Sequence, residues 1–167
     1  EASCMLVYIV TASINQLVNL EDLKDASAQQ IKVLVIDEGD KSIRKDNDKI
    51  LSSLPYEYYG PGEREQWFKE RLGRAFKKYQ DLIPKNCHAE TAFGFLKAYE
   101  DQATAILEID DDVHISGRFV KEHLNSLFCD GGITVSSQGK WYNTVEDLYL
   151  NVDQRIFPRG HPYSPLC

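Results

Sequence analysis

The sequence lacks the features that mark several large classes of protein. It has no apolar run of membrane-spanning length, so no transmembrane span is predicted. Its formal net charge at pH 7 is −7, which argues against nucleic acid as the main partner. No signal peptide is predicted, and the sequence shows no internal repeat or low-complexity segment. The remaining composition, 43% hydrophobic and 27% charged over 167 residues, predicts one globular domain over 1–167.

Cysteine is sparse as well. The four cysteines are widely spaced and form no C-x-x-C pair, so neither a zinc site nor a disulfide framework is indicated. Cys4 and Cys129 border apolar stretches, and we expect both to be buried thiols. This pattern favours a reducing compartment, and we expect a cytoplasmic protein.

Several well-known binding motifs are absent. Gly60 and Gly62 have the spacing of a dinucleotide-binding turn, but Glu65 stands where its third glycine belongs. A calcium loop beginning at Asp110 fails because its sixth position is Ile115 and its twelfth is Lys121. The sequence also lacks a phosphate-binding P-loop and a Gly-x-Ser-x-Gly nucleophile elbow. Carboxylate and metal chemistry is what remains.

The most informative segment is an apolar run that ends in three aspartates, over residues 104–112. Such a run is typical of a strand buried in a parallel sheet, and ligands bind beyond the carboxyl ends of these strands. Three adjacent carboxylates repel one another, and hard divalent cations prefer oxygen ligands. We therefore expect a metal at Asp110 and Asp112. An acidic loop without any ligand is the alternative, and the motif alone does not separate the two.

The order of strands and helices predicts an α/β fold: a three-layer α/β/α sandwich with a mainly parallel sheet. Periodicity places strands at 5–12, 32–37, 56–59, 104–109 and 133–137. It places a short helix, capped by Ser13 and Asn15, through about residue 25. Further helices are predicted at 42–54, 67–83 and 88–100, and a last one is capped by Ser116 and closed by Gly131 and Gly132. In this arrangement the first two strand exits and the aspartates lie along one edge of the sheet.

The helical periodicity also predicts which side chains face the core. Helix 67–83 should be continuous, with Leu82 among the residues of its apolar face. Helix 88–100 should bury Ala92, Phe93, Leu96 and Tyr99, and the last helix should bury Phe119, Val120, His123, Leu124 and Leu127.

Other polar residues are weaker candidates for a site. Asp37 ends the second strand, where it fits either a nucleoside contact or a helix cap. Arg159 lies on a stiff segment between Pro158 and Gly160, which suits a diphosphate contact, although an ordinary surface arginine is equally consistent. His114 and His161 are more typical of loop histidines than of metal ligands.

Five short segments follow one another along the chain: Asp37-Glu38-Gly39-Asp40, Tyr56-Glu57-Tyr58-Tyr59, Ala92-Phe93-Gly94-Phe95, Ile109-Asp110-Asp111-Asp112 and Arg159-Gly160-His161-Pro162-Tyr163-Ser164. In this order they resemble motifs of the reversibly glycosylated polypeptides, a family with the GT-A fold of nucleotide-sugar glycosyltransferases that includes the UDP-arabinopyranose mutases. The last two segments correspond to the family's triple aspartate and to the segment that carries its glycosylated arginine.

The resemblance implies a UDP-sugar ligand, Mn²⁺ or Mg²⁺ at the Asp-x-Asp (DXD) motif, and Asp37 near the nucleotide. It also implies that Arg159 is the residue that becomes glycosylated. We further expect Thr11 to contact the nucleoside, and Asp111 and Arg159 to contact the nucleotide sugar. Thr91 and Leu166 stand where the family has arginines. The chain ends near the middle of what those proteins span, so we expect either a missing acceptor-binding portion or a minimal relative.

The resulting hypothesis is a metal-dependent glycosyltransferase with a UDP-sugar donor. Two alternatives remain open. The first is a UDP-sugar mutase that glycosylates itself reversibly, and the second is a catalytically silent nucleotide-sugar-binding protein. The sequence does not identify the acceptor, a catalytic base or the oligomeric state.

Overall fold

The structure is a computed structural model that describes residues 5–25, 30–83, 88–115 and 118–129. The chain divides into two compact units, residues 1–128 and 129–167, and the helices and strands below all belong to the first. Within the described ranges, none of the helices has the length and apolar character needed to cross a membrane.

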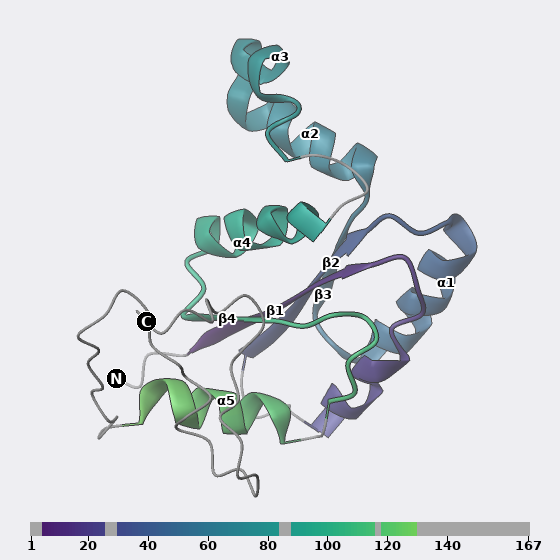
Figure 1. Ribbon diagram of the computed structural model, residues 1–167, viewed down its shortest axis with the longest axis vertical. Coiled ribbons are helices and arrows are strands. Elements are labelled where there is room, and N and C mark those ends of the chain that lie inside the picture. The colour runs from purple at the N-terminus through teal and green to yellow at the C-terminus, as the bar shows by residue number, and fades with distance from the viewer. Residues whose placement is uncertain (1–4, 26–29, 84–87, 116–117, 130–167) are drawn as a thin grey trace, which may run out of the picture. The chain divides into compact units, whose positions relative to one another are not determined.

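Four parallel strands form the sheet, in the order β3-β2-β1-β4 (Figure 1). They are β1 (Leu6–Ser13), β2 (Gln30–Asp37), β3 (Tyr56–Tyr59) and β4 (Ala105–Glu108). The predicted α/β class with a parallel sheet is confirmed. Because all strands run in one direction, their carboxyl ends meet at one edge, as expected.

The two faces of the sheet carry separate cores because side chains alternate along a strand. One core joins Val7 and Ile9 of β1 to η1 (Val18–Asp25), η2 (Leu51–Ser53) and α5 (Phe119–Phe128). The other joins Tyr8 and Val10 to α4 (Thr91–Glu100) and to the apolar side chains of α2 (Pro61–Leu72). Helices therefore cover both faces (Figure 1).

Helix α1 (Lys41–Ile50) is shorter than the predicted 42–54, and η2 takes the remaining turn. Its start is fixed by Asp40, whose Oδ1 accepts hydrogen bonds from the backbone N–H groups of Ser42 (2.7 Å) and Ile43 (3.0 Å).

The prediction of one continuous helix over 67–83 is wrong. Helix α2 begins six residues earlier, at Pro61, because proline is well suited to a first helical position. It ends at Leu72, because Gly73 has a φ of +49° that other residues rarely adopt. The 3-10 turn η3 (Gly73–Ala75) and the short α3 (Phe76–Tyr79) follow. Leu82, expected on the apolar face, is 68% exposed.

The predicted inner face of α4 is also wrong in part. Phe93 is buried as expected, but Ala92 and Leu96 are exposed, and Tyr99 is 81% exposed. The buried face instead carries Phe93 with three other residues, Gly94, Lys97 and Ala98. Close packing decides this orientation, since a Cβ on Gly94 would lie 2.3 Å from Val10 Cγ1.

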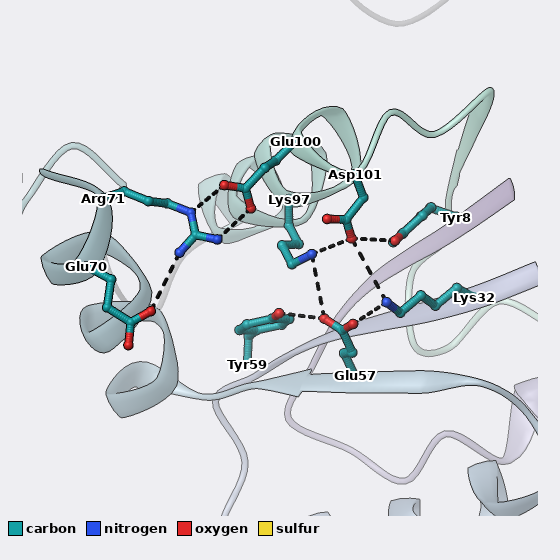
Figure 2. Close-up of polar contacts among 9 residues, drawn as sticks. All are labelled: Tyr8, Lys32, Glu57, Tyr59, Glu70, Arg71, Lys97, Glu100 and Asp101. Atoms are coloured by element: carbon teal, nitrogen blue, oxygen red, sulfur yellow. Dashed lines mark hydrogen bonds and ion pairs between the residues drawn. The ribbon is translucent and has the colours of Figure 1, made fainter. Parts of the chain in front are cut away.

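Lys97 can be buried because it belongs to a ring of ionic contacts between α4 and the sheet (Figure 2). This ion ring consists of Lys32, Glu57, Lys97 and Asp101. Lys97 pairs with Asp101 and lies 3.9 Å from Glu57, whereas Lys32 pairs with Glu57 and lies 4.0 Å from Asp101. Two hydroxyls complete the ring, because Tyr8 donates to Asp101 and Tyr59 to Glu57, each at 2.5 Å.

Three further predictions about burial need correction. Strand β4 was expected inside the sheet, but in the described part of the chain it is an edge strand with Ile106 37% exposed. On α5, Val120 and Leu124 are buried, but His123 is exposed and Leu127 is 60% exposed. Cys129, expected to be buried, is exposed. Of the α5 residues, Val120 and Leu124 belong to the buried core, and Phe119 packs against it.

Candidate functional site

The three aspartates follow β4 where the strand order reverses. The chain adds β2 and β3 on one side of β1 and then places β4 on the other side (Figure 1). In parallel α/β sheets a crevice forms at such a reversal, beyond the carboxyl ends of the strands. The fold therefore brings Asp110, Asp111 and Asp112 to the position where this class of sheet binds ligands.

The aspartates form a tight turn. Val113 donates its backbone N–H to the carbonyl of Asp110 at 3.2 Å, which closes four residues into a β-turn. Asn19 of η1 supports the turn from inside: its Nδ2 donates to the carbonyls of Asp110 (3.3 Å) and Val113 (3.0 Å). We call residues 110–113 the aspartate turn.

The three carboxylates do not point the same way. Asp111 Oδ2 accepts from Asn15 Nδ2 at 3.0 Å and lies 2.9 Å from Ser13 Oγ. The single hydroxyl hydrogen of Ser13 serves either Asp111 or the Asn15 carbonyl, which is also 2.9 Å away. Asp110 and Asp112 are exposed.

This arrangement corrects the expected role of Ser13 and Asn15 as helix caps. The helix begins only at Val18, as the 3-10 helix η1. Both polar side chains turn to Asp111 instead, because β4 brings that carboxylate to the end of β1.

Asp37 lies beside Ser13, its partner in the register of β1 and β2. It is 4% exposed, and its Oδ1 accepts from the backbone N–H of Gly39 at 2.9 Å. Burial raises the pKa of this carboxyl, and the Gly39 hydrogen bond and the charge of Arg44 oppose the rise. A buried carboxylate at the ligand-binding edge is a typical property of a functional site.

The sequence analysis missed Arg64. This residue is 6% exposed, and its guanidinium donates to the carbonyls of Tyr59 (2.9 Å) and Asp37 (3.5 Å) and pairs with Glu38. Burial lowers the pKa of Arg64 against the opposing charges of Glu90 and Asp37. Arg64 thus connects the carboxyl ends of β2 and β3 through hydrogen bonds to both. Nothing in its local sequence distinguishes it from the other basic residues of α2.

The remaining predicted residues are placed as follows. Thr11 is fully buried, and in the described part of the chain its Oγ1 has no hydrogen-bond partner. His114 is exposed. Arg159 and His161 lie outside the described residues, so their predicted roles remain predictions.

An open hollow of about 610 Å³ borders the aspartate turn. It is lined by residues of β4, the turn and α5: Ile106, Leu107, Glu108, Ile109, Asp110, Val113, Phe119 and His123. Its volume falls within the usual range for small-molecule sites. Asp110 is therefore placed where a ligand has room.

Asp110 and Asp112 are the residues that could hold a divalent cation sharing a phosphate ligand. Within the described ranges, no group of three or more His, Cys, Asp or Glu side chains is arranged to hold a metal alone. Mg²⁺ commonly uses only one or two carboxylates, with water and substrate phosphates as its other ligands. Asp110 and Asp112, both exposed at the turn, meet that requirement.

The chain was compared with known proteins. No protein-family model matches it. No curated protein matches it either. Its function therefore has to be argued from the chemistry of the site.

Proposed function

We propose that the protein is a metal-dependent glycosyltransferase of the GT-A type with a UDP-sugar as its donor. The observation that carries the proposal is the aspartate turn, which lies at the strand-order reversal with Asp110 and Asp112 exposed. The order β3-β2-β1-β4, with helices on both faces, also supports a three-layer α/β/α arrangement of that type.

Each residue has a distinct role in this proposal. Asp110 and Asp112 hold a Mn²⁺ or Mg²⁺ ion, which when bound neutralises charge on the diphosphate. Asp37 accepts hydrogen bonds from the nucleoside, and Arg159 contacts the diphosphate or the sugar. During transfer, the bond from the anomeric carbon to the diphosphate oxygen breaks and its electron pair leaves with UDP. The acceptor oxygen bonds to the same carbon, and its proton passes to the departing diphosphate or to water.

Calorimetric titration of UDP and UDP-sugars tests the proposal, with Mn²⁺ and with chelator. We expect binding by the wild type that depends on Mn²⁺ and is lost in Asp112→Ala. Asp81→Ala is the matched control, because Asp81 is an exposed aspartate outside the site. A folded wild type that binds no UDP compound under any metal condition would contradict the proposal.

The mutase alternative makes a different prediction. Incubation with a UDP-sugar labelled in the sugar would attach label covalently to Arg159. Transfer of label to a separate acceptor, with none retained by the protein, would favour the glycosyltransferase.

A further inference from the structure

The inner side of the aspartate turn contains a buried polar group that the proposed roles leave unused. Asn19 is 5% exposed, and its Nδ2 is occupied by the carbonyls of Asp110 and Val113. In the described part of the chain, its Oδ1 is buried without a hydrogen-bond donor. An unsatisfied buried acceptor is costly, so a hydrogen-bond donor from a bound ligand or its ordered water would stabilise Asn19 in this place.

The turn is also fixed through the side chain of Asp111. Its Oδ2 faces Ser13 Oγ, at the last residue of β1, and Asn15 Nδ2, on the segment that leaves β1. The backbone of that segment is itself anchored, since the buried Asn47 donates to the Asn15 carbonyl at 3.0 Å and accepts from the Leu17 N–H at 2.8 Å. Asp111 therefore connects the turn to a rigid part of the sheet edge.

This use of Asp111 distinguishes it from its two neighbours. Asp110 and Asp112 are exposed and form no ion pair with any other described residue. Turning all three carboxylates outward would place three like charges together, whereas one held inward leaves a pair for a cation. The side chains that hold a metal ligand in place strongly influence the metal affinity of a site.

We propose that Asn15, Asn19 and Asp111 are positioning residues, which hold the aspartate turn so that Asp110 and Asp112 alone bind the cation. Asp111 acts as a hydrogen-bond acceptor within the protein and does not bind the metal or the nucleotide sugar. This inference rests on the proposed function, because it assigns roles within the same metal and nucleotide site.

The test compares variants that remove a charge with variants that remove a hydrogen bond. Asp111→Asn keeps an oxygen acceptor for Asn15 and Ser13 but loses the charge, whereas Asp111→Ala loses both. Asp112→Asn removes the charge of a proposed ligand. Asn15→Ala removes one donor to Asp111 at an exposed position, and Asn125→Ala, an exposed asparagine of α5, is its matched control. The readouts are the Kd of UDP with Mn²⁺, from calorimetry, and the thermal midpoint without ligand.

We expect Asp111→Asn to stay within about 3-fold of the wild-type Kd, and Asn15→Ala and Asp111→Ala to weaken binding about 10-fold or more. Asp112→Asn should abolish metal-dependent binding, and Asn125→Ala should leave it unchanged. If Asp111→Ala does not fold, the comparison of Asn15→Ala with Asn125→Ala still decides the result.

Two results would overturn the inference and leave the proposed function intact. In the first, the wild type binds but Asp111→Asn loses binding as fully as Asp112→Asn, which makes Asp111 a ligand. In the second, Asn15→Ala binds as well as Asn125→Ala. A folded wild type that fails to bind UDP with Mn²⁺ would instead remove the proposed function, and the positioning roles with it.

Discussion

At the scale of single residues, Gly94 shows how a missing side chain sets the position of a helix. Its backbone lies so close to β1 that an added Cβ would meet Val10 Cγ1 at 2.3 Å and Val10 Cβ at 3.4 Å. Val10 is fully buried in the sheet. Helix α4 would have to shift to accept any larger residue.

Gly94→Ala should therefore destabilise the protein, by about 1–3 kcal/mol, because the overpacked contact forces backbone movement. Urea unfolding measures the change. Gly62→Ala in α2 is the control, since its added Cβ meets nothing within 4 Å and alanine favours a helix. Equal stability of the two variants would contradict the close packing of α4 on β1.

Asp37 provides a prediction about pH. Burial raises its pKa above the ordinary 3.8, so the folded state binds the proton more tightly than the unfolded state. Keeping the buried carboxylate charged costs free energy of folding. This cost is absent below pH 3.8, grows as the pH rises through the folded pKa of Asp37, and is complete above that pKa. Asp37→Asn should thus be more stable than wild type at pH 7, and the difference should vanish in acid.

Urea unfolding of Asp37→Asn and wild type, at several pH values from 7 to about 3, measures this difference. A variant that is less stable than wild type at pH 7 would contradict the assignment. If the variant also loses UDP binding, Asp37 serves the function of the protein although its buried charge lowers the stability of the fold.

At the scale of elements, the ion ring complements Gly94 in fixing α4. Gly94 and Phe93 pack the first half of the helix, and Lys97 with Asp101 attaches its end to β2 and β3 (Figure 2). A buried lysine is stable only with its counter-charges. Lys97→Met should cost about 1–3 kcal/mol, because Glu57 and Asp101 lose a charged partner in a partly buried setting.

The control for Lys97→Met is Lys69→Met on α2. Lys69 also pairs with a carboxylate, Glu65 at 2.6 Å, but its side chain is 50% exposed. Exposed pairs of this kind contribute about 0–1 kcal/mol. Urea unfolding that shows equal losses for the two variants would contradict a structural role for the ion ring.

The same ring predicts a loss of stability in acid. Burial acts to raise the pKa of Glu57 and Asp101, but hydrogen bonds from Lys32, Lys97 and the two tyrosines outweigh it, and both pKa values are lowered. The stability that these two carboxylates contribute is complete above their ordinary pKa values of 4.5 and 3.8. It is lost as the pH falls through their lower pKa values in the folded state. Between about pH 5 and pH 3, the double variant Glu57→Gln, Asp101→Asn should therefore lose less of its free energy of unfolding than the wild type loses.

At the scale of the whole first unit, protection from hydrogen exchange should follow the sheet order. Strand β1 pairs with β2 over eight residues and with β4 on its other side, whereas α3 is a four-residue helix with mostly exposed side chains. We expect the slowest amide exchange in β1 and the fastest among the helices in α3. Exchange followed by mass spectrometry tests this, and protection of α3 comparable with that of β1 would contradict it.

Local patterns in the sequence determined much of this molecule. The apolar runs defined β1, β2 and β4, and β3 matches the predicted 56–59. A parallel sheet then placed Asp37 and the three aspartates at one edge, because parallel strands end on the same side. Periodicity also located α4 and α5, although it misplaced most of the inner face of α4.

Only the tertiary structure decided how these elements meet. The buried face of α4 follows from the contact of Gly94 with Val10 and from the counter-charges of Lys97, which come from β3 and from the end of α4 itself. The inward turn of Asp111 depends on Ser13 and Asn15, more than ninety residues away in the chain. Sequence patterns report the preferences of neighbouring residues, whereas partners of this kind are fixed only when the folded chain brings distant segments into contact.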